Sequence, residues 1–279
     1  VVVTGGTSGT GGGFEKFMAG TTDISDASRP VKQSEIESGR SNGIEFIEIP
    51  VAYDGLTIVV NPENTFVTQL TVDQLKQIFL ADSAAKTWQD VDPSWPAEEI
   101  RLFIPGTDSG TFDYFKEVVA GKEGTIRSNG VATSENDNEL VGNVAGDKNA
   151  LGFFGAAYYF SNRERVRAVP IVNPEGETVS PTSETIEDGS YAPFGRPLFI
   201  YVNVKSLERL EVAKFIEFYL EHAAQFSTEV GYVGLPQSVY DAARSNVESR
   251  STGTQFLDAS GESRSGSLVD IYRATGGAE

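Results

Sequence analysis

Cysteine is absent from this chain of 279 residues, and histidine occurs only once. The absence of cysteine excludes disulfides, thiolate metal ligands and a cysteine nucleophile. The single histidine, His222, lies between Glu221 and Ala223 in a stretch with helical periodicity, where we expect it to face solvent. With one histidine and no cysteine, zinc has no credible set of ligands. We therefore expect no metal, and the sequence contains no motif for another cofactor.

Basic residues are also scarce, with 22 Lys and Arg against 40 Asp and Glu and a formal net charge of −18. This balance argues against binding to nucleic acid or to an anionic membrane, which require a basic surface. No apolar run approaches the ~20 residues that span a bilayer, and no export signal is visible, so we expect no direct membrane insertion. A small anion remains an acceptable ligand, because salt screens surface charges beyond about 8–10 Å.

Glycine, serine and threonine are concentrated in two loops, at residues 7–13 (Thr-Ser-Gly-Thr-Gly-Gly-Gly) and 106–111 (Gly-Thr-Asp-Ser-Gly-Thr). Each loop runs directly into an apolar stretch with a helical pattern. Glycines allow backbone N–H groups to converge, hydroxyls add neutral donors, and a helix N-terminus carries about half a positive charge. The pattern therefore predicts an anion site, although either loop alone could be an ordinary turn between a strand and a helix.

Strand-like and helix-like segments alternate along most of the chain, which predicts an α/β fold with mainly parallel sheets. The expected strands are residues 1–4, 46–51, 56–60, 100–104, 151–155, 166–172 and 196–202, with a further short strand and a turn within residues 23–30. The expected helices include residues 14–19, 71–79, 112–119, 156–160 and 207–226, and a polar tail is expected from 245 to 266. In such folds ligands bind at the carboxyl ends of strands, where both glycine-rich loops are placed.

Neither loop has the chemistry of a nucleotide-binding or catalytic motif. A P-loop requires Lys followed by Ser or Thr after its glycines, and no such pair is present. The dinucleotide fingerprint fails because Phe14 stands where a third glycine is required. Ser109 lies in an Asp-Ser-Gly sequence but has no histidine base. What remains is binding, so we expect a binding protein and not an enzyme.

Asp26 adds a hydrogen-bond acceptor to this predicted anion site, and Arg29 adds a guanidinium with several N–H donors. A carboxylate repels a fully ionised anion, but it accepts a hydrogen bond from an anion that still carries a proton. Sulfate has no such proton and would leave the carboxylate unpaired, at a cost of about 1–3 kcal/mol. Asp26 would thus favour phosphate over sulfate. The alternative is that Asp26 caps a local turn and Arg29 forms a surface ion pair.

Six segments resemble the phosphate-binding proteins of phosphate-specific ABC transporters, the PstS family. They are Thr-Ser-Gly-Thr-Gly-Gly-Gly-Phe (7–14), Asp-Ile-Ser-Asp-Ala-Ser-Arg-Pro (23–30), Gly-Thr-Asp-Ser-Gly-Thr-Phe-Asp-Tyr-Phe (106–115), Ser-Glu-Asn-Asp-Asn-Glu-Leu-Val (134–141), Ala-Gly-Asp-Lys-Asn-Ala-Leu-Gly-Phe-Phe-Gly (145–155) and Gly-Ser-Tyr-Ala-Pro-Phe-Gly-Arg-Pro-Leu-Phe-Ile-Tyr-Val (189–202). The matches occur in order across most of the chain.

The resemblance implies a two-lobed periplasmic-binding-protein fold of type II, with hinge strands and a phosphate cleft between the lobes. Lobe I would comprise residues 1–60 and 195–279, and lobe II residues 61–194. The hinge crossings would fall near Leu56–Asn61 and Pro197–Asn203. The implied function is high-affinity binding of phosphate and its delivery to a membrane permease. The implied protein is a monomer in the periplasm or outside the cell, with a lipid anchor as one alternative.

Carried onto this chain, the family's phosphate ligands fall in both loops and in the segment between them. They are Thr7, Ser8, Gly9, Asp26, Arg29, Ser109, Gly110, Thr111 and Asp137. Asp26 matches the carboxylate that accepts the proton of phosphate. Arg29 is the candidate positive group by analogy with members that carry the same Ser-Arg-Pro. Asp137 is included as a residue that binds the ligand or only shapes the cleft.

Two departures from the family pattern bear on the expected site. Many members begin with a further strand and a Gly-Ser-Ser-Thr-like loop, and nothing of the kind precedes Val1, so either the sequence given lacks that segment or the site is incomplete. Some members also have an arginine just before the Ser-Gly-Thr loop, where this chain has Pro105-Gly106. Three alternatives stay open at this point: a phosphate sensor or storage protein, a receptor for sulfate or molybdate, and a phosphate-ester hydrolase, which the single histidine disfavours.

Overall fold

The computed structural model describes residues 2–6, 8–83, 85–107, 109–121, 124–264 and 266–275. Contacts between residues divide the chain into two compact units. The first unit comprises Val1–Asp54, Glu187–Gly189 and Arg196–Glu279, and the second comprises Gly55–Ile186 and Ser190–Gly195. Each unit is an α/β structure in which strands and helices enclose a buried core.

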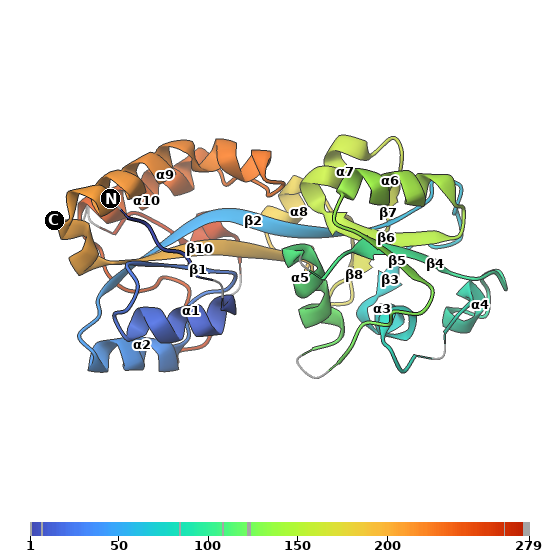
Figure 1. Ribbon diagram of the computed structural model, residues 1–279, viewed down its shortest axis with the longest axis horizontal. Helices are drawn as coiled ribbons and strands as arrows, with labels where there is room; N and C mark the ends of the chain where they lie inside the picture. Colours follow the sequence, from blue (N-terminus) through green and yellow to red (C-terminus); the bar gives the residue numbers. More distant parts are fainter. Residues whose placement is uncertain are drawn as a thin grey trace. The chain divides into compact units, whose positions relative to one another are not determined.

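The first unit has a sheet with the strand order β1-β10-β2 and helices on both faces. Its strands are β1 (Ile24–Ala27), most of β10 (Gly195–Asn203) and the first part of β2 (Phe46–Val60). Helices α1 (Gly9–Met18) and α2 (Gln33–Ser41) cover one face, and α9 (Leu210–Glu229) and α10 (Gln237–Glu248) cover the other (Figure 1). The short helices η1 (Val204–Glu208) and α11 (Leu268–Ile271) complete the unit.

The second unit has a sheet with the order β2-β6-β4-β5, and β7 also pairs with β2. Its strands are the second part of β2, β4 (Arg101–Pro105), β5 (Val131–Ser134), β6 (Ala150–Gly155) and β7 (Arg167–Ala168). A smaller sheet contains β3 (Leu70–Thr71), β8 (Ile171–Val172) and β9 (Thr178–Val179). Its helices are α3 (Val72–Phe79), α4 (Trp88–Val91), α5 (Gly110–Val119), α6 (Asp137–Gly146), α7 (Ala156–Asn162) and α8 (Ser183–Glu187).

Local sequence signals for helices are confirmed where they were strongest. Thr71 caps α3, with its hydroxyl accepting a hydrogen bond from the Gln74 backbone N–H at 3.1 Å. The apolar stripe of that helix, Leu75, Ile78 and Phe79, is buried. These signals succeed because they depend on residues three or four positions apart, which a helix brings together whatever its surroundings.

Strand β2 is one strand of 15 residues, all of them buried, where the sequence predicted two separate strands. The expected strands, 46–51 and 56–60, left a gap that contains Asp54-Gly55, a dipeptide typical of turns. In the structure, Gly55 allows close packing within the second unit, because a Cβ at this position would lie 2.7 Å from Ile186 Cδ1 and 2.9 Å from Ala156 Cβ. The contact-based division falls between Asp54 and Gly55, whereas the sequence-based boundary was placed after residue 60.

The sheets are mixed and not mainly parallel as expected. Strand β4 pairs in parallel with β5 and β6, but β2 pairs antiparallel with β6, and β1 antiparallel with β10. The parallel pairs are joined through helices, as such pairs require. The antiparallel pairs of the larger sheet involve β2 or β10, the two strands that pass from one unit into the other, and β8 pairs antiparallel with β9 in the smaller sheet.

The expected strand at residues 1–4 is not formed by its described residues, Val2 to Thr4. Val2 and Val3 are 91% and 87% exposed, and no described strand pairs with them. A β-branched run forms a strand only where a neighbouring strand accepts its hydrogen bonds. This expectation was therefore wrong for the described residues.

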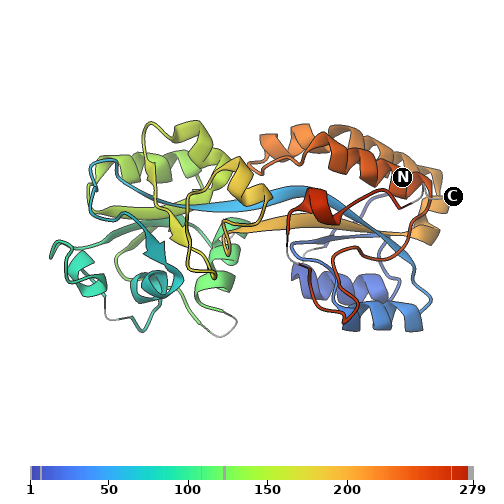
Figure 2. The same cartoon turned by 180° about the vertical axis from the view of Figure 1, so that it is seen from behind.

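The expected polar tail divides into a helix and a segment that enters the first unit. Helix α10 extends to Glu248, which the sequence analysis had placed within the tail. Beyond it, Gly253 forms a parallel bridge with Ile47 of β2, and the segment continues beside that strand (Figure 2). Thr254 and Gln255 then reach the side chain of the buried Glu48.

We predict that Gly152→Ala destabilises the second unit. A Cβ at Gly152 in β6 would lie 2.5 Å from the carbonyl oxygen of Phe103 in β4, and backbone atoms within a sheet cannot easily move apart. We expect a loss of about 1–3 kcal/mol in the free energy of unfolding, measured by urea denaturation. The matched control is Gly142→Ala in α6, where only Arg165 approaches, at 3.9 Å. It should be neutral or stabilising by up to about 1 kcal/mol. Equal effects of the two substitutions would contradict the packing argument.

Candidate functional site

The first glycine-rich loop forms the N-terminus of α1. Ser8 occupies the N-cap position and makes no side-chain capping bond, and Gly9 has φ of +64°, in the region that favours glycine. Ser8 and Gly9 are both exposed. The first N–H groups of a helix have no partner within it and carry partial positive charge, so this end of α1 can bind an anion. Thr7, also predicted as a ligand, lies outside the described residues.

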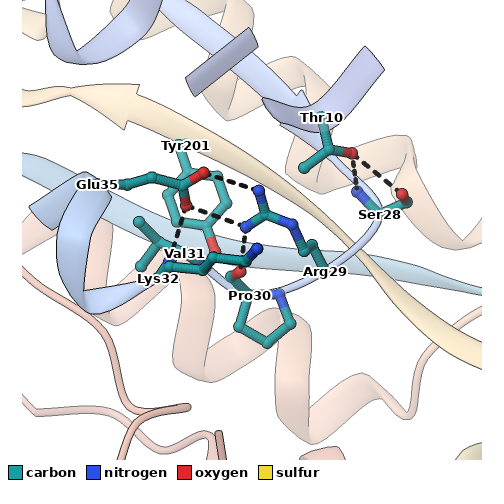
Figure 3. Close-up of polar contacts among 8 residues, drawn as sticks. All are labelled: Thr10, Ser28, Arg29, Pro30, Val31, Lys32, Glu35 and Tyr201. Atoms are coloured by element: carbon teal, nitrogen blue, oxygen red, sulfur yellow. Dashed lines mark hydrogen bonds and ion pairs between the residues drawn. The ribbon is translucent and has the colours of Figure 1, made fainter. Parts of the chain in front are cut away.

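Contacts with β1 hold the start of α1 in place. The Thr10 hydroxyl lies 3.0 Å from the Ser28 hydroxyl and accepts a hydrogen bond from the Ser28 backbone N–H at 3.1 Å (Figure 3). A Cβ at Gly13 would lie 2.9 Å from the Ser25 hydroxyl oxygen, so glycine allows α1 to approach the strand. The loop and the strand that carries Asp26 therefore pack together within the first unit.

Asp26 lies on β1, opposite Ile200 of β10, with its side chain accessible to solvent. No side chain or backbone group among the described residues donates a hydrogen bond to its carboxylate. Nearby protein atoms desolvate the carboxylate, which raises its pKa above the ordinary value even though the side chain is accessible. Burial, with the charge of Asp26 as a smaller cause, raises the pKa of Tyr219 on α9 to about 12. Asp26 is thus an acceptor that lacks a donor.

Arg29 forms the ion pair that the sequence analysis kept as its alternative role. Its guanidinium donates two hydrogen bonds to Glu35, from Nη1 at 2.9 Å and from Nη2 at 2.7 Å (Figure 3). It also donates to the Pro30 carbonyl oxygen at 3.0 Å and lies 5.2 Å from the centre of the Phe14 ring. Glu35 accepts a further bond from the Lys32 backbone N–H at the start of α2. An anion bound near Arg29 would share its positive charge with Glu35.

The second glycine-rich loop lies at the carboxyl end of β4. Ser109 caps α5, with its hydroxyl oxygen accepting from the Thr111 backbone N–H at 3.2 Å and its own N–H donating to the Gly106 carbonyl at 3.1 Å. The Ser109 hydroxyl hydrogen is not used in the capping bond and is available to a ligand. Gly110 is exposed and Thr111 is half-buried. The structure thus places Ser109, Gly110 and Thr111 together at one helix N-terminus.

Asp137 lies at the same edge of this sheet, because β4 and β5 are parallel and Pro105 pairs with Ser134. It is the first residue of α6, which Asn136 caps by accepting from the Asn138 N–H at 3.0 Å. Burial and the negative charge of Glu135 raise the pKa of Asp137. A pair of neighbouring carboxylates favours a cation or a proton, so the role of Asp137 as an anion ligand stays a prediction.

Glu135 is the acidic neighbour that the sequence analysis did not select. Its carboxylate lies directly over Gly106, where a Cβ would overlap Oε1. The feature that places Glu135 there is the parallel pairing of β4 with β5, which brings residues 105–106 and 134–135 together. Among the described residues, no group of three or more His, Asp or Glu side chains could hold a metal ion.

Comparison with known proteins identifies the family. The family profile described as "PBP superfamily domain" matches residues 1–222. The phosphate-binding protein PstS of Staphylococcus saprophyticus is 41% identical over 249 residues, which cover 89% of this chain and 76% of the relative. The chain belongs to the PstS family. The expected two-lobed α/β periplasmic-binding-protein fold is confirmed with it.

Two further relatives of this PstS-family chain support the same assignment. Protein SphX of Synechococcus elongatus is 44% identical over 276 residues, covering 98% of this chain and 80% of the relative. The crystal structure of a possible phosphate binding protein from Planctomyces limnophilus is 45% identical, with a TM-score of 0.82, and the alignment covers 86% of this chain and 85% of that one. In the part of the chain that is described, no helix is both long and apolar enough to cross a bilayer.

We predict opposite effects of two neutralising substitutions on the stability of the anion-free protein. The raised pKa of Asp26 means that its ionisation costs stability above its ordinary pKa of 3.8. Asp26→Asn should therefore raise the urea midpoint at pH 7, with the difference shrinking as the pH falls below about 4. The control is Asp23→Asn, because hydrogen bonds from Arg209 and Ser206 lower the pKa of Asp23. This variant should lower the midpoint at pH 7, and a shift of both variants in one direction would contradict the assignment.

Proposed function

We propose that this PstS-family chain binds inorganic phosphate outside the cytoplasm and delivers it to the membrane permease of an ABC transporter. The observation that carries the proposal is Asp26, an acceptor without a donor on a strand that packs against the N-terminus of α1. Its relatives named phosphate-binding protein PstS support the ligand, and their family supports a location in the periplasm or outside the cell.

Neutral donors would supply most of the binding. In the first unit, backbone N–H groups at the start of α1 and the Ser8 hydroxyl can donate to the oxygens of a tetrahedral anion. In the second unit, the start of α5 with the hydroxyls of Ser109 and Thr111 offers donors of the same kind. Arg29 would contribute through its charge while remaining paired with Glu35.

Asp26 would provide the choice between phosphate and sulfate. At neutral pH each phosphate ion carries one or two protons, and one of them can be donated to the carboxylate. Sulfate has none, so its binding would bring two negative groups together and leave Asp26 unpaired. A missing hydrogen bond at a desolvated group costs about 1–3 kcal/mol, which corresponds to a factor of about 5 to 150 in affinity.

The test is calorimetric titration of the protein with phosphate and separately with sulfate. Bound anion is first removed by unfolding and refolding, because a tightly bound phosphate would hide the site. We expect one phosphate per chain, with sulfate binding about 5 to 150 times more weakly. Equal affinity for both anions would contradict the role of Asp26, and silence with both would contradict the proposed function.

We predict that Asp26→Asn reduces the preference for phosphate over sulfate. The amide removes the negative charge that repels sulfate and offers an N–H donor in its place. Phosphate affinity should fall while sulfate affinity rises, as measured by the same titrations. Asp23→Asn, on the same segment but bonded to Ser206 and Arg209, should leave the preference unchanged. If the preference for phosphate is unchanged in the Asp26 variant, residues other than Asp26 determine the selectivity.

Thr111→Val tests whether the second glycine-rich loop binds phosphate. The substitution removes one hydroxyl donor at the start of α5 and keeps the shape of the side chain. We expect both phosphate and sulfate to bind more weakly by roughly 1–2 kcal/mol, with phosphate still at one per chain. The control is Thr228→Val, an exposed position on α9 whose hydroxyl bonds only to the Ala224 carbonyl oxygen. Unaltered phosphate affinity in the Thr111 variant would argue against a role of this loop in phosphate binding.

A further inference from the structure

Glu48 is a buried carboxylic acid near the start of β2, only 3% exposed. Its Oε1 accepts hydrogen bonds from the Tyr201 hydroxyl at 2.6 Å and from the Thr254 hydroxyl at 2.9 Å. Its Oε2 lies 2.7 Å from the Thr254 hydroxyl and accepts from the Gln255 backbone N–H at 3.1 Å. Every one of these donors is neutral, so the carboxylate has hydrogen bonds but no ion pair. A core position normally excludes such a group unless its partners are specific.

Tyr201 connects this carboxyl group to the candidate anion site. Its hydroxyl donates to Glu48 and accepts from the Val31 backbone N–H at 2.9 Å. Figure 3 shows Tyr201 beside Val31. Its ring meets the Phe14 ring of α1 edge to face, with centroids 4.7 Å apart. Tyr201 thus contacts both parts of the candidate site in the first unit. These parts are the segment 26–31 and the helix that begins at Gly9.

The hydrogen bonds have a consistent direction from the core to the loop. Because Glu48 accepts the Tyr201 hydroxyl hydrogen, the Tyr201 oxygen is left to accept from Val31. A hydroxyl that donates to a carboxylate becomes a better acceptor, since the two bonds polarise one another. The hydrogen bond at Val31 therefore depends on both Tyr201 and Glu48.

We propose that Glu48 and Tyr201 are positioning residues, which hold the segment from Asp26 to Val31 and the start of α1 in the geometry that binds the anion. Neither side chain is proposed to touch the ligand. Thr254 and Gln255 extend the same network to the C-terminal segment, so that segment supports the site as well. The proposal rests on the proposed function, because it concerns the binding of that anion.

The protonation of Glu48 gives the network a characteristic pH dependence. Burial raises the pKa of Glu48 to about 7, and the hydrogen bonds from Tyr201, Thr254 and Gln255 oppose the shift. The other groups that face it are Tyr201 on β10 and Tyr272 of the C-terminal segment, whose pKa values are both raised by burial. The charge of Arg29 acts on Tyr201. Glu48 is therefore the member of this network that titrates near neutral pH.

The decisive comparison is between Tyr201→Phe and Tyr240→Phe. Tyr240 is also buried in the first unit, and its hydroxyl donates to the Val51 carbonyl at 2.8 Å and accepts from the Leu235 N–H at 3.1 Å. Both variants lose one hydroxyl with two hydrogen bonds, and both should lower the urea midpoint. Only Tyr201→Phe should weaken phosphate binding, by about fivefold or more in titrations of the folded proteins. Equal phosphate affinities of the two variants would overturn the proposal.

Glu48→Gln tests the pH dependence. The ratio of its phosphate dissociation constant to that of the unsubstituted protein is measured between pH 6 and pH 8, because the ionisation of phosphate itself cancels in the ratio. The ratio should be larger at pH 8, where Glu48 is ionised, and approach one at pH 6, where Glu48 is largely protonated and resembles glutamine. A ratio that does not change with pH would overturn the role of Glu48.

Hydrogen exchange provides a readout that does not depend on ligand binding. Exchange of the Val31 amide hydrogen should be faster in Tyr201→Phe than in Tyr240→Phe. This comparison tests the proposal even if Glu48→Gln does not fold. Similar exchange rates in the two variants would show that Tyr201 does not hold this segment. If the unsubstituted protein itself fails to bind phosphate, the proposed function is wrong. If it binds and Tyr201→Phe binds equally well, only the positioning role is wrong.

Discussion

The burial of β2 along its whole length is the constraint on which the rest of the structure depends. All 15 residues from Phe46 to Val60 are buried, so every polar group among them needs a partner within the protein. In the first unit this strand carries Glu48, and in the second unit it pairs with β6 and β7. The close packing at Gly55 lets the strand continue through the position where the units divide. Two cores are thereby organised along one segment of chain.

The proposed site would bind an anion in a strongly acidic protein through backbone N–H groups and hydroxyls. Backbone N–H groups at helix N-termini act at hydrogen-bond distance, where distant surface charges are screened. The cation closest to the first loop, Arg29, is already paired with Glu35, and the second loop has Glu135 beside it. Such a site depends on geometry more than on net charge. This dependence is the reason why residues that position the loops, such as Tyr201, matter to binding.

Much of the fold and part of the site could be predicted from the sequence. The helices that follow the glycine-rich loops, the cap at Thr71, the cluster Ser109 to Thr111 and the family itself were all recognised from residues close together in the chain. Strands were harder, because a strand has no stability without its neighbours. The run Val2 to Thr4 is the clearest case, since its β-branched residues have no described partner strand.

The sequence by itself determined the α/β class, the PstS family and the two helix N-termini rich in Ser, Gly and Thr, because these depend on spacings of a few residues. Tertiary structure alone decided the partners. Glu48 meets Tyr201 across 153 positions and Thr254 across 206, Glu135 lies over Gly106, and β2 runs unbroken past Asp54. No local pattern encodes these contacts, since they arise only when distant strands pair and the C-terminal segment packs beside β2.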